Sequence, residues 1–385
     1  ALPRIGNDPT GLAAAGAAAS QGTGDLDQAH QMLRRALQLD PNNAWAWART
    51  GWAHFFGGDY DAAEQCFHRA RRQSPLDPLR FNLDNGLAGV HFVREEFAEA
   101  AALSTIPGVR VCPMRSDAEV LTVNSGTRVD ARLLDQAPSA QLVLTTTSGF
   151  DHLDLNEIAA RGILAGRCPL ARRDAVVDSA LCLVLEGLRT HGPLSTAARQ
   201  GHWNRAELPQ LGMRTLRGAD VGVVGLGVIG LQMCDVLQAL GAQVCATDPL
   251  VPPPPGVTAR SLPEMVRQCD AITLHCRLEK GSRHLIDADL LSSARDLVLV
   301  NTARGSIVRV ADAVTAVNGG QLAFLGLDVF PTEPWDQLQA STHPRITYLP
   351  HAAGFHRDLG EAVADELVAA VSAFAEGRAL PHAVR

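Results

Sequence analysis

Short apolar runs alternate with amphipathic segments along the chain from residue 109 onward. Such runs predict strands, and apolar positions at helical spacing predict helices. The run at 220–224 is apolar at consecutive positions, so both faces of the strand would be buried. This is typical of parallel strands covered by helices on both sides. The predicted strands are 109–112, 118–124, 141–146, 162–166, 220–224, 243–247, 271–275, 297–301, 324–328 and 345–349. The predicted helices are 130–135, 155–160, 174–190, 229–240, 262–268, 287–294, 310–317 and 357–377. This order predicts a doubly wound α/β fold, divided into two units by a polar break at 193–215.

The first part of the chain contains an internal repeat with a period of 34 residues. Its positions are Trp47, Gly51, Tyr60, Ala63, Phe67, Ala70 and Pro75, and its second half recurs earlier as Ala29, Leu33, Ala36 and Pro41. Small residues let two antiparallel helices cross closely, large ones fill the gaps, and proline ends the unit. Residues 22–78 therefore resemble the tetratricopeptide repeat family, with the alanine-rich stretch at 13–19 as an earlier helix. The resemblance implies a peptide or protein partner, and the alternative is helical hairpins without a partner.

Composition narrows the class of protein. The formal net charge of -7 gives no basic surface, so we expect neither nucleic acid nor an acidic membrane as a partner. No apolar run reaches the roughly 18 residues that are needed to span a bilayer. The eight cysteines form no CxxC pair and lie mostly among apolar residues, as small buried side chains do in a reducing compartment. We therefore expect a globular cytoplasmic protein without a metal site.

A glycine-rich motif, Gly225-x-Gly227-x-x-Gly230, lies directly between a predicted strand and a predicted helix. The glycines allow a tight turn, a close approach of the backbone to a diphosphate, and close contact of helix and strand. The helix N-terminus adds amide donors and the positive end of the helix dipole. Asp248 ends the next strand, 18 residues past Gly230, where a carboxylate accepts ribose hydroxyls and repels a 2′-phosphate. No arginine follows Asp248 directly, so the motif predicts NAD rather than NADP as the cofactor.

Three further motifs follow in order: NTARG at 301–305, DVFPTEP at 328–334 and PHAAG at 350–354. Together with the glycine-rich motif, they make residues 109–385 resemble the D-isomer-specific 2-hydroxyacid dehydrogenases. Within that family the chain is most similar to the phosphoglycerate dehydrogenase branch. The resemblance implies hydride transfer between NAD and a small 2-hydroxy acid or its 2-oxo acid.

The residue types of these motifs suit that chemistry. Reduction of a 2-oxo acid needs a hydride at the carbonyl carbon and a proton at its oxygen. Histidine titrates near neutral pH and can carry the proton, so His351 is the candidate general acid and base. Glu333 would hold one imidazole nitrogen, orient the ring and stabilise the imidazolium. Arg304 offers a rigid fork of donors for the substrate carboxylate and the carbonyl oxygen.

The resemblance also implies contacts at other positions. The residues expected at the cofactor are Gly225, Gly227, Val228, Ile229, Gly230, Asp248, Cys276, Thr302, Ala303 and Asp328. The loop TTSGFD at 146–151 resembles the loop whose backbone amides hold the substrate carboxylate, with Ser148 and Gly149 as the candidate contacts.

Three positions depart from the family pattern. The segment 124–128 has only Arg128 where phosphoglycerate enzymes carry an arginine-rich loop, which argues against a phosphate monoester as substrate. Ser179 stands where relatives often carry an aromatic residue or histidine on the interdomain helix. Arg277 replaces the usual proline after the pair His275 and Cys276.

The resemblance implies three parts: tetratricopeptide-like repeats at 1–86, a discontinuous flavodoxin-like substrate domain at 89–192 and 349–385, and a Rossmann NAD-binding domain at 193–348. A flavodoxin-like sheet has its first strand in the interior, and the apolar run at 89–93 is the candidate for that strand. We therefore predict a strand at 89–93. The alternative is a third helical repeat, because 91–100 echoes 54–63. Members of the family are usually homodimers.

A function of a different class stays open. Some relatives act as NAD(H)-sensing corepressors or scaffolds, and a peptide-binding repeat module suits such a role. The complete set of Arg304, Glu333 and His351 favours the enzyme. Turnover of small 2-oxo acids with NADH distinguishes the two functions.

Overall fold

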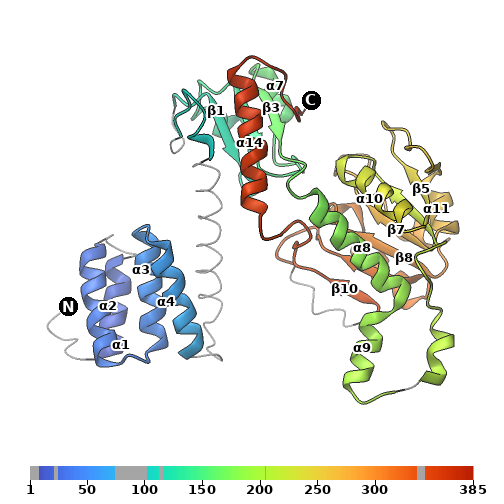
Figure 1. The fold of residues 1–385 in the computed structure, drawn as a ribbon, viewed down its shortest axis with the longest axis horizontal. Helices are drawn as coiled ribbons and strands as arrows, with labels where there is room; N and C mark the ends of the chain where they lie inside the picture. The colour runs from blue at the N-terminus through green and yellow to red at the C-terminus, as the bar shows by residue number, and fades with distance from the viewer. Residues whose placement is uncertain are drawn as a thin grey trace. The chain divides into compact units, whose positions relative to one another are not determined.

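The computed structural model describes residues 8–20, 25–73, 102–111, 116–203, 205–335 and 343–384 (Figure 1). The chain divides into two compact units, Ala1–Val111 and Cys112–Arg385. Each unit has hydrophobic core residues of its own. The strand predicted at 89–93 and the competing third helical repeat lie outside the described residues.

The first unit is built from helices that each pack against the next one along the chain. They are α1 (Pro9–Ala18), α2 (Leu26–Leu39), α3 (Ala44–Phe56) and α4 (Tyr60–Gln73). The helices begin where the sequence supplies acceptors for free N–H groups. The side chain of Asp25 accepts the N–H of Gln28 at the start of α2. Asn43 caps α3 in the same way by accepting the N–H of Ala46.

The same pairing of a small and a large residue recurs in both helix pairs. Gly16 of α1 faces Leu33 of α2, and Gly51 of α3 faces Phe67 of α4. A Cβ at either glycine would lie 2.7 Å from the facing side chain, so these close approaches require glycine. The two helix pairs are therefore copies of one hairpin, as the repeat pattern predicts.

We expect Phe67→Ala to destabilise the helical unit by about 3 kcal/mol, as is usual for truncation of a fully buried aromatic side chain. Phe67 is fully buried, and its ring meets that of Trp52 edge-on with centroids 5.5 Å apart. Chemical denaturation followed by far-ultraviolet circular dichroism measures the change. Phe56→Ala, which removes a ring that is 48% exposed, is the matched control. Equal losses in both variants would contradict this packing.

The second unit begins with a small parallel sheet, here named the small-sheet lobe. Its strands are β1 (Val120–Val123), β2 (Leu142–Thr145) and β3 (Leu164–Arg167), in the order β1-β2-β3. Helices α6 (Ala131–Leu134) and α7 (Leu155–Ala160) connect them, and Ile158 and Leu134 fill their core. The end of the chain returns to this lobe, because Ala383 forms an antiparallel bridge with Gly166 of β3.

The strand predicted at 109–112 is wrong for the three positions that the structure describes. Residues 109–111 carry no strand, and Cys112 lies outside the described residues. The backbone follows a turn instead, in which the N–H of Val109 donates to the carbonyl oxygen of Ile106 at 3.1 Å.

A larger parallel sheet forms the other half of the second unit, the large-sheet lobe. Its strands are β4 (Asp220–Val224), β5 (Gln243–Thr247), β6 (Thr258–Ala259), β7 (Ala271–Leu274), β8 (Leu297–Asn301), β9 (Leu322–Leu327) and β10 (Ile346–Tyr348). Their order is β10-β9-β8-β7-β4-β5-β6, and every neighbouring pair is parallel.

Helices cover both faces of the large sheet, as the apolar runs predict. On one face lie α8 (Arg173–Arg189) and α10 (Val228–Ala239); on the other lie α11 (Leu262–Gln268), α12 (Ala288–Leu291) and α13 (Val310–Asn318). Alternate residues of β8 point to opposite faces of the sheet. Val298 and Val300 pack on the face of α8 and α10, and Leu297 and Leu299 pack on the face of α11, α12 and α13. The remaining elements are α9 (His191–Arg199), the short 3₁₀ helices η3 (Arg205–Leu211) and η4 (Gly305–Ile307), and α14 (Leu359–Ala375).

The elements predicted from residue 118 onward are confirmed. Four of the described elements were not predicted: β6, α9 and the 3₁₀ helices η3 and η4. The two-residue strand β6 is too short to show a period. Helix α9 lies where a polar break was expected; its described side chains include none that is fully buried, so it has no apolar face to reveal it.

Candidate active site

The glycine-rich loop joins β4 to α10 at the carboxyl edge of the large sheet. Gly225 has a φ of +94°, and a Cβ there would overlap the backbone of Cys276. A Cβ at Gly230 would overlap the carbonyl oxygen of Gly225, so both positions require glycine. A Cβ at Gly227, in contrast, would meet nothing within 4 Å. The loop is therefore open beside the N-terminus of α10, which begins with Val228 and Ile229, where a dinucleotide's diphosphate can bind.

Asp248 follows β5 and fixes the glycine-rich loop. Its Oδ2 accepts the N–H of Leu226 at 2.7 Å. Its Oδ1 accepts the N–H groups of Leu250 and Val251 at 2.8 and 3.0 Å. A carboxylate has about four acceptor sites, so Asp248 keeps capacity for a ribose hydroxyl. It also lines a surface hollow together with Ala246, Thr247, Pro253, Ala259, Arg260 and Ser261.

Sequence reasoning missed Arg260, which lines the same hollow as Asp248. The pairing of β6 with β5 brings it there, although it follows Asp248 only after a proline-rich stretch. Its Nη1 lies 3.4 Å from Oδ1 of Asp220. The hollow thus combines an acidic and a basic side chain.

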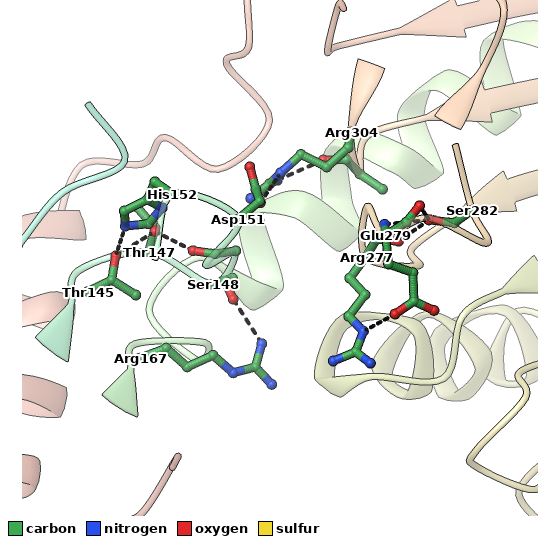
Figure 2. A network of polar contacts seen from close by, with 12 residues as sticks. Thr145, Thr147, Ser148, Asp151, His152, Arg167, Arg277, Glu279, Ser282 and Arg304 are labelled. Carbon is green, nitrogen blue, oxygen red and sulfur yellow. Dashed lines mark hydrogen bonds and ion pairs between the residues drawn. The ribbon is translucent and has the colours of Figure 1, made fainter. Parts of the chain in front are cut away.

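Arg304 lies in the turn after β8 and reaches the small-sheet lobe. Its Nε donates to Oδ1 of Asp151 at 2.8 Å, and its Nη1 donates to the carbonyl oxygen of Ala303 at 2.8 Å (Figure 2). A Cβ at Gly149 would overlap Nη2 of Arg304, so the guanidinium lies directly against that glycine. Burial raises the pKa of Asp151, but the charge and hydrogen bond of Arg304 outweigh it, so the pKa lies below its usual value. Sequence reasoning predicted Arg304 and Gly149 but not Asp151.

Asn301 shapes the turn that carries Arg304. Its side chain, at the buried end of β8, accepts the N–H of Ala303 at 3.0 Å and donates to the carbonyl oxygen of Arg304 at 2.9 Å. The hydroxyl oxygen of Thr302 in the same turn is buried and has no hydrogen-bond partner among the residues that the structure describes. A buried polar atom without a partner is costly, and a bound ligand would relieve that cost.

His351 and Glu333 form a second pair. Nδ1 of His351 lies 2.6 Å from Oε2 of Glu333, whose Oε1 accepts the N–H of Phe330 at 3.0 Å. Glu333 is thereby held from both of its oxygens. The His351 side chain is 51% exposed, so its other ring nitrogen is accessible to a ligand. Its φ of +54° places it in the left-handed region, a strained conformation that clusters at functional sites.

Asp328 lies between the Arg304–Asp151 pair and the His351–Glu333 pair. Its N–H donates to the carbonyl oxygen of Asn301 at 3.0 Å, and its carbonyl oxygen accepts the N–H of His351 at 2.8 Å. Its buried carboxylate accepts the N–H groups of Ala352 and Ala353. Burial raises the pKa of Asp328, although those two hydrogen bonds oppose the rise. The ends of β8, β9 and β10 are thus tied together at one edge of the sheet.

The loop 146–151 of the small-sheet lobe is held by hydrogen bonds from a side chain of its own and from one on β3. Oγ1 of Thr147 donates to the carbonyl oxygen of Gly149 at 2.7 Å, and Nη1 of Arg167 donates to that of Ser148 at 2.8 Å. His152, which directly follows the loop, pairs with the hydroxyl of Thr145 at 2.9 Å. Burial lowers the pKa of His152, which favours its neutral form. The roles of His152 and Arg167 had no sequence signal, because they depend on contacts outside any motif.

The predicted residues therefore gather at the carboxyl edge of the large sheet. The glycine-rich loop, Cys276, Thr302, Ala303 and Asp328 all follow its strands. Arg304 meets the loop of Ser148 and Gly149, and His351 meets Glu333. The open side of Gly227 and the unpartnered hydroxyl of Thr302 suit a dinucleotide that runs along this edge.

A doubly wound α/β lobe with a glycine-rich loop, joined to a second α/β lobe at this edge, defines the class of dinucleotide-binding proteins. Residues 181–353 match the NAD binding domain of D-isomer specific 2-hydroxyacid dehydrogenases, and residues 21–83 match a tetratricopeptide repeat. The glyoxylate reductase of Aeropyrum pernix is 30% identical over 268 residues, or 67% of this chain and 80% of that protein. The chain belongs to the D-isomer specific 2-hydroxyacid dehydrogenase family of NAD-binding oxidoreductases, with a tetratricopeptide repeat segment before the dehydrogenase part.

Other relatives show the breadth of the family. D-3-phosphoglycerate dehydrogenase of Mycobacterium tuberculosis is 30% identical over 273 residues, and the chain spans about half, 51%, of its length. A solved NADPH-dependent glyoxylate/hydroxypyruvate reductase from Sinorhizobium meliloti, in complex with NADP and malonate, is 30% identical with a TM-score of 0.61. That match covers 74% of this chain and 88% of that one. D-lactate dehydrogenase from Aquifex aeolicus, with NAD and lactic acid, is 26% identical, also with a TM-score of 0.61, over 69% and 86% of the two chains.

The described residues contain neither a membrane-spanning helix nor a cluster of metal ligands. None of the helices in that part of the chain is both long and apolar enough to cross a membrane. The same residues contain no cluster of three or more histidine, cysteine, aspartate or glutamate side chains that could hold a metal ion.

Proposed function

We propose that this chain transfers a hydride between NAD and a small 2-hydroxy acid or its 2-oxo acid. The observation that carries the proposal is the 2.6 Å contact of His351 with Glu333 at the sheet edge where Arg304 also projects. When bound, the nicotinamide supplies or accepts the hydride. His351 donates a proton to the substrate oxygen in reduction and removes it in oxidation. Glu333 keeps the ring oriented and stabilises the imidazolium.

Arg304 and the loop 146–151 hold the substrate in this proposal. Asp151 fixes Nε of Arg304 at 2.8 Å, which leaves Nη2 beside Gly149 to bind an anion. The amides of Ser148 and Gly149 would receive the substrate carboxylate, opposite that guanidinium. Because the ion pair joins the two lobes, it favours the closed arrangement that excludes water from the reacting atoms.

We propose repeats at 1–86, a substrate domain at 89–172 and 349–385, and an NAD-binding domain at 173–348. The boundary expected at 192 moves to 172, because α8 packs against the large sheet. The bridge between Gly166 and Ala383 supports the return of the chain to the substrate domain. The position of β10 in the large sheet supports a boundary just after it.

The substrate is a small 2-oxo acid without a phosphate group. Arg128, the arginine of the segment 124–128, is exposed, and the turn there is closed by Asn124, whose side chain accepts the N–H of Gly126 at 3.0 Å. Oxidation of NADH in the presence of glyoxylate, pyruvate, hydroxypyruvate and phosphohydroxypyruvate tests this choice. Turnover of the phosphorylated acid alone would contradict it.

Asp248→Asn is expected to reduce the preference for NAD over NADP by about tenfold, or ~1.4 kcal/mol. The amide keeps an acceptor for the N–H of Leu226 but removes the charge that repels a 2′-phosphate. Arg260 in the same hollow then attracts that phosphate. The ratio of kcat/KM for NADH and NADPH measures the change, with Asp235→Asn on α10 as a control. An unaltered ratio would exclude Asp248 from the ribose site.

A scaffold that senses NAD(H) is the second candidate, and the tetratricopeptide match at 21–83 favours it. Such a protein would bind NADH and a peptide partner without turning over any 2-oxo acid. Binding of NADH with no turnover across the substrate panel would therefore replace the first proposal with this one.

A further inference from the structure

Two arginines approach each other from different lobes, and neither belongs to the proposed catalytic set. Arg167 ends β3 in the small-sheet lobe, and Arg277 lies just beyond β7 in the large-sheet lobe. Figure 2 shows their guanidinium groups pointing toward one another. The proximity also has an electrostatic signature: burial lowers the pKa of Arg167, and the charge of Arg277 lowers it further.

Each arginine is held in this position by its own lobe. Arg167 donates from Nη1 to Ser148 and lies over the ring of Phe150, with 5.5 Å between its Cζ and the ring centroid. Nε of Arg277 donates to Oε2 of Glu279 at 3.0 Å. Glu279 pairs with Arg277, and the charge of Glu366 acts on Arg167, but among the described residues no ion pair joins both guanidinium groups to one carboxylate. Two like charges that converge in this way indicate an anionic ligand.

The ligand is not the substrate carboxylate. In a trans peptide the carbonyl oxygen and the next N–H point in opposite directions. Because the carbonyl oxygen of Ser148 accepts from Arg167, the N–H of Gly149 points away from Arg167. Figure 2 likewise shows Arg304 and Arg167 on opposite sides of this peptide. The arginine pair therefore faces a different part of the bound molecules from that which Arg304 binds.

Arg277 lies next in sequence to a residue that contacts the glycine-rich loop. Arg277 directly follows Cys276, whose backbone lies against Gly225 of the glycine-rich loop. The loop itself contributes Leu226, Val228 and Ile229, and no charged side chain, to the expected diphosphate site. A dinucleotide's diphosphate carries two negative charges, and charge-assisted bonds from guanidinium groups are the strongest available complement.

We propose that Arg277 and Arg167 close on the diphosphate of the bound dinucleotide, one from each lobe. The inference rests on the proposed cofactor site and adds residues that the glycine-rich motif does not contain. It also gives the cofactor a way to draw the lobes together, because each arginine is fixed to its own lobe.

The test measures binding to the full chain, independent of turnover. NADH is titrated by its fluorescence, and ADP-ribose and adenosine by displacement of NADH. Arg277→Ala and Arg167→Ala should each weaken NADH and ADP-ribose about tenfold, as expected for loss of a charge-assisted bond, and leave adenosine unchanged. Arg283→Ala, which removes an exposed arginine from the same segment, is the matched control. Arg277→Lys should retain part of the affinity, since it keeps the charge but not the fork.

Three outcomes would overturn the inference: unchanged NADH affinity in the Arg277 variant, an equal loss for adenosine, or unchanged NADH affinity with a raised KM for dicarboxylic 2-oxo acids alone. The last would assign the pair to a second acidic group of the substrate. Arg277 is half exposed, so its variant should fold even if the Arg167 variant does not. This test is independent of the proposed function. A chain that turns over no 2-oxo acid would contradict the proposed function, yet its Arg277 and Arg167 variants could still bind NADH and ADP-ribose more weakly.

Discussion

Replacing His351 by alanine should lower turnover by about 10²- to 10⁴-fold, which is the usual contribution of a general acid or base. The affinity for NADH should change little, because the expected cofactor contacts lie on the glycine-rich loop, Asp248 and the turn at Thr302. Steady-state kinetics with the best 2-oxo acid, together with a fluorescence titration of NADH, measures both quantities.

Two further variants sharpen the test of His351. His202→Ala removes an exposed histidine outside the site and should behave like wild type. Glu333→Gln keeps a side chain that can reach Nδ1 of His351 but cannot stabilise the imidazolium by charge, so a smaller loss is expected. Wild-type turnover in His351→Ala would remove this residue from the mechanism.

The second large effect is expected at a residue with no functional group. Gly149→Ala should lower kcat/KM about 10²-fold, since displacement of a positioning group by about 1 Å is enough for such a loss. The added Cβ would occupy the place of Nη2 of Arg304. That atom is the end of a flexible side chain, so the guanidinium should swing away while the fold persists.

Gly281→Ala provides the control for this substitution. A Cβ at Gly281 would meet nothing within 4 Å, so the same chemical change there should leave kinetics unaltered. The melting temperature of Gly149→Ala should stay near that of wild type. A normal kcat/KM in Gly149→Ala would show that Arg304 does not need its position beside Gly149.

The sequence predicted the periodic elements and the residues inside motifs. Strands such as β8 are recognised by consecutive apolar residues, which are buried on both faces of the sheet. The glycine-rich loop is recognised by the fixed spacing of its glycines. The segment 109–111, predicted as a strand, follows a turn and carries no strand, which shows the limit of such patterns. Val109-Arg110-Val111 alternates apolar and polar side chains as a strand does, but three residues are too few for this pattern to establish a strand.

Contacts between distant segments could not be predicted in this way. Asp151 is 153 positions from Arg304, yet its ion pair decides how that guanidinium is oriented. Arg260 reaches the hollow of Asp248 only because the two-residue strand β6 pairs with β5. Arg277 departs from the family pattern, but Arg167, which lies near it in the structure, has no sequence signal. Such residues belong to the tertiary structure, and only the packing of strands brings them together.

The return of the chain to β3 has a consequence for the order in which the protein forms. The N–H of Arg167 donates to the carbonyl oxygen of His382, and Gly166 pairs with Ala383, so residues synthesised long after β3 complete its sheet. On the ribosome the large-sheet lobe, which is continuous in sequence, can fold as a unit before the small-sheet lobe is finished. The substrate loop, held by Arg167, therefore reaches its final form after the cofactor site, through contacts of high sequence separation that form slowly.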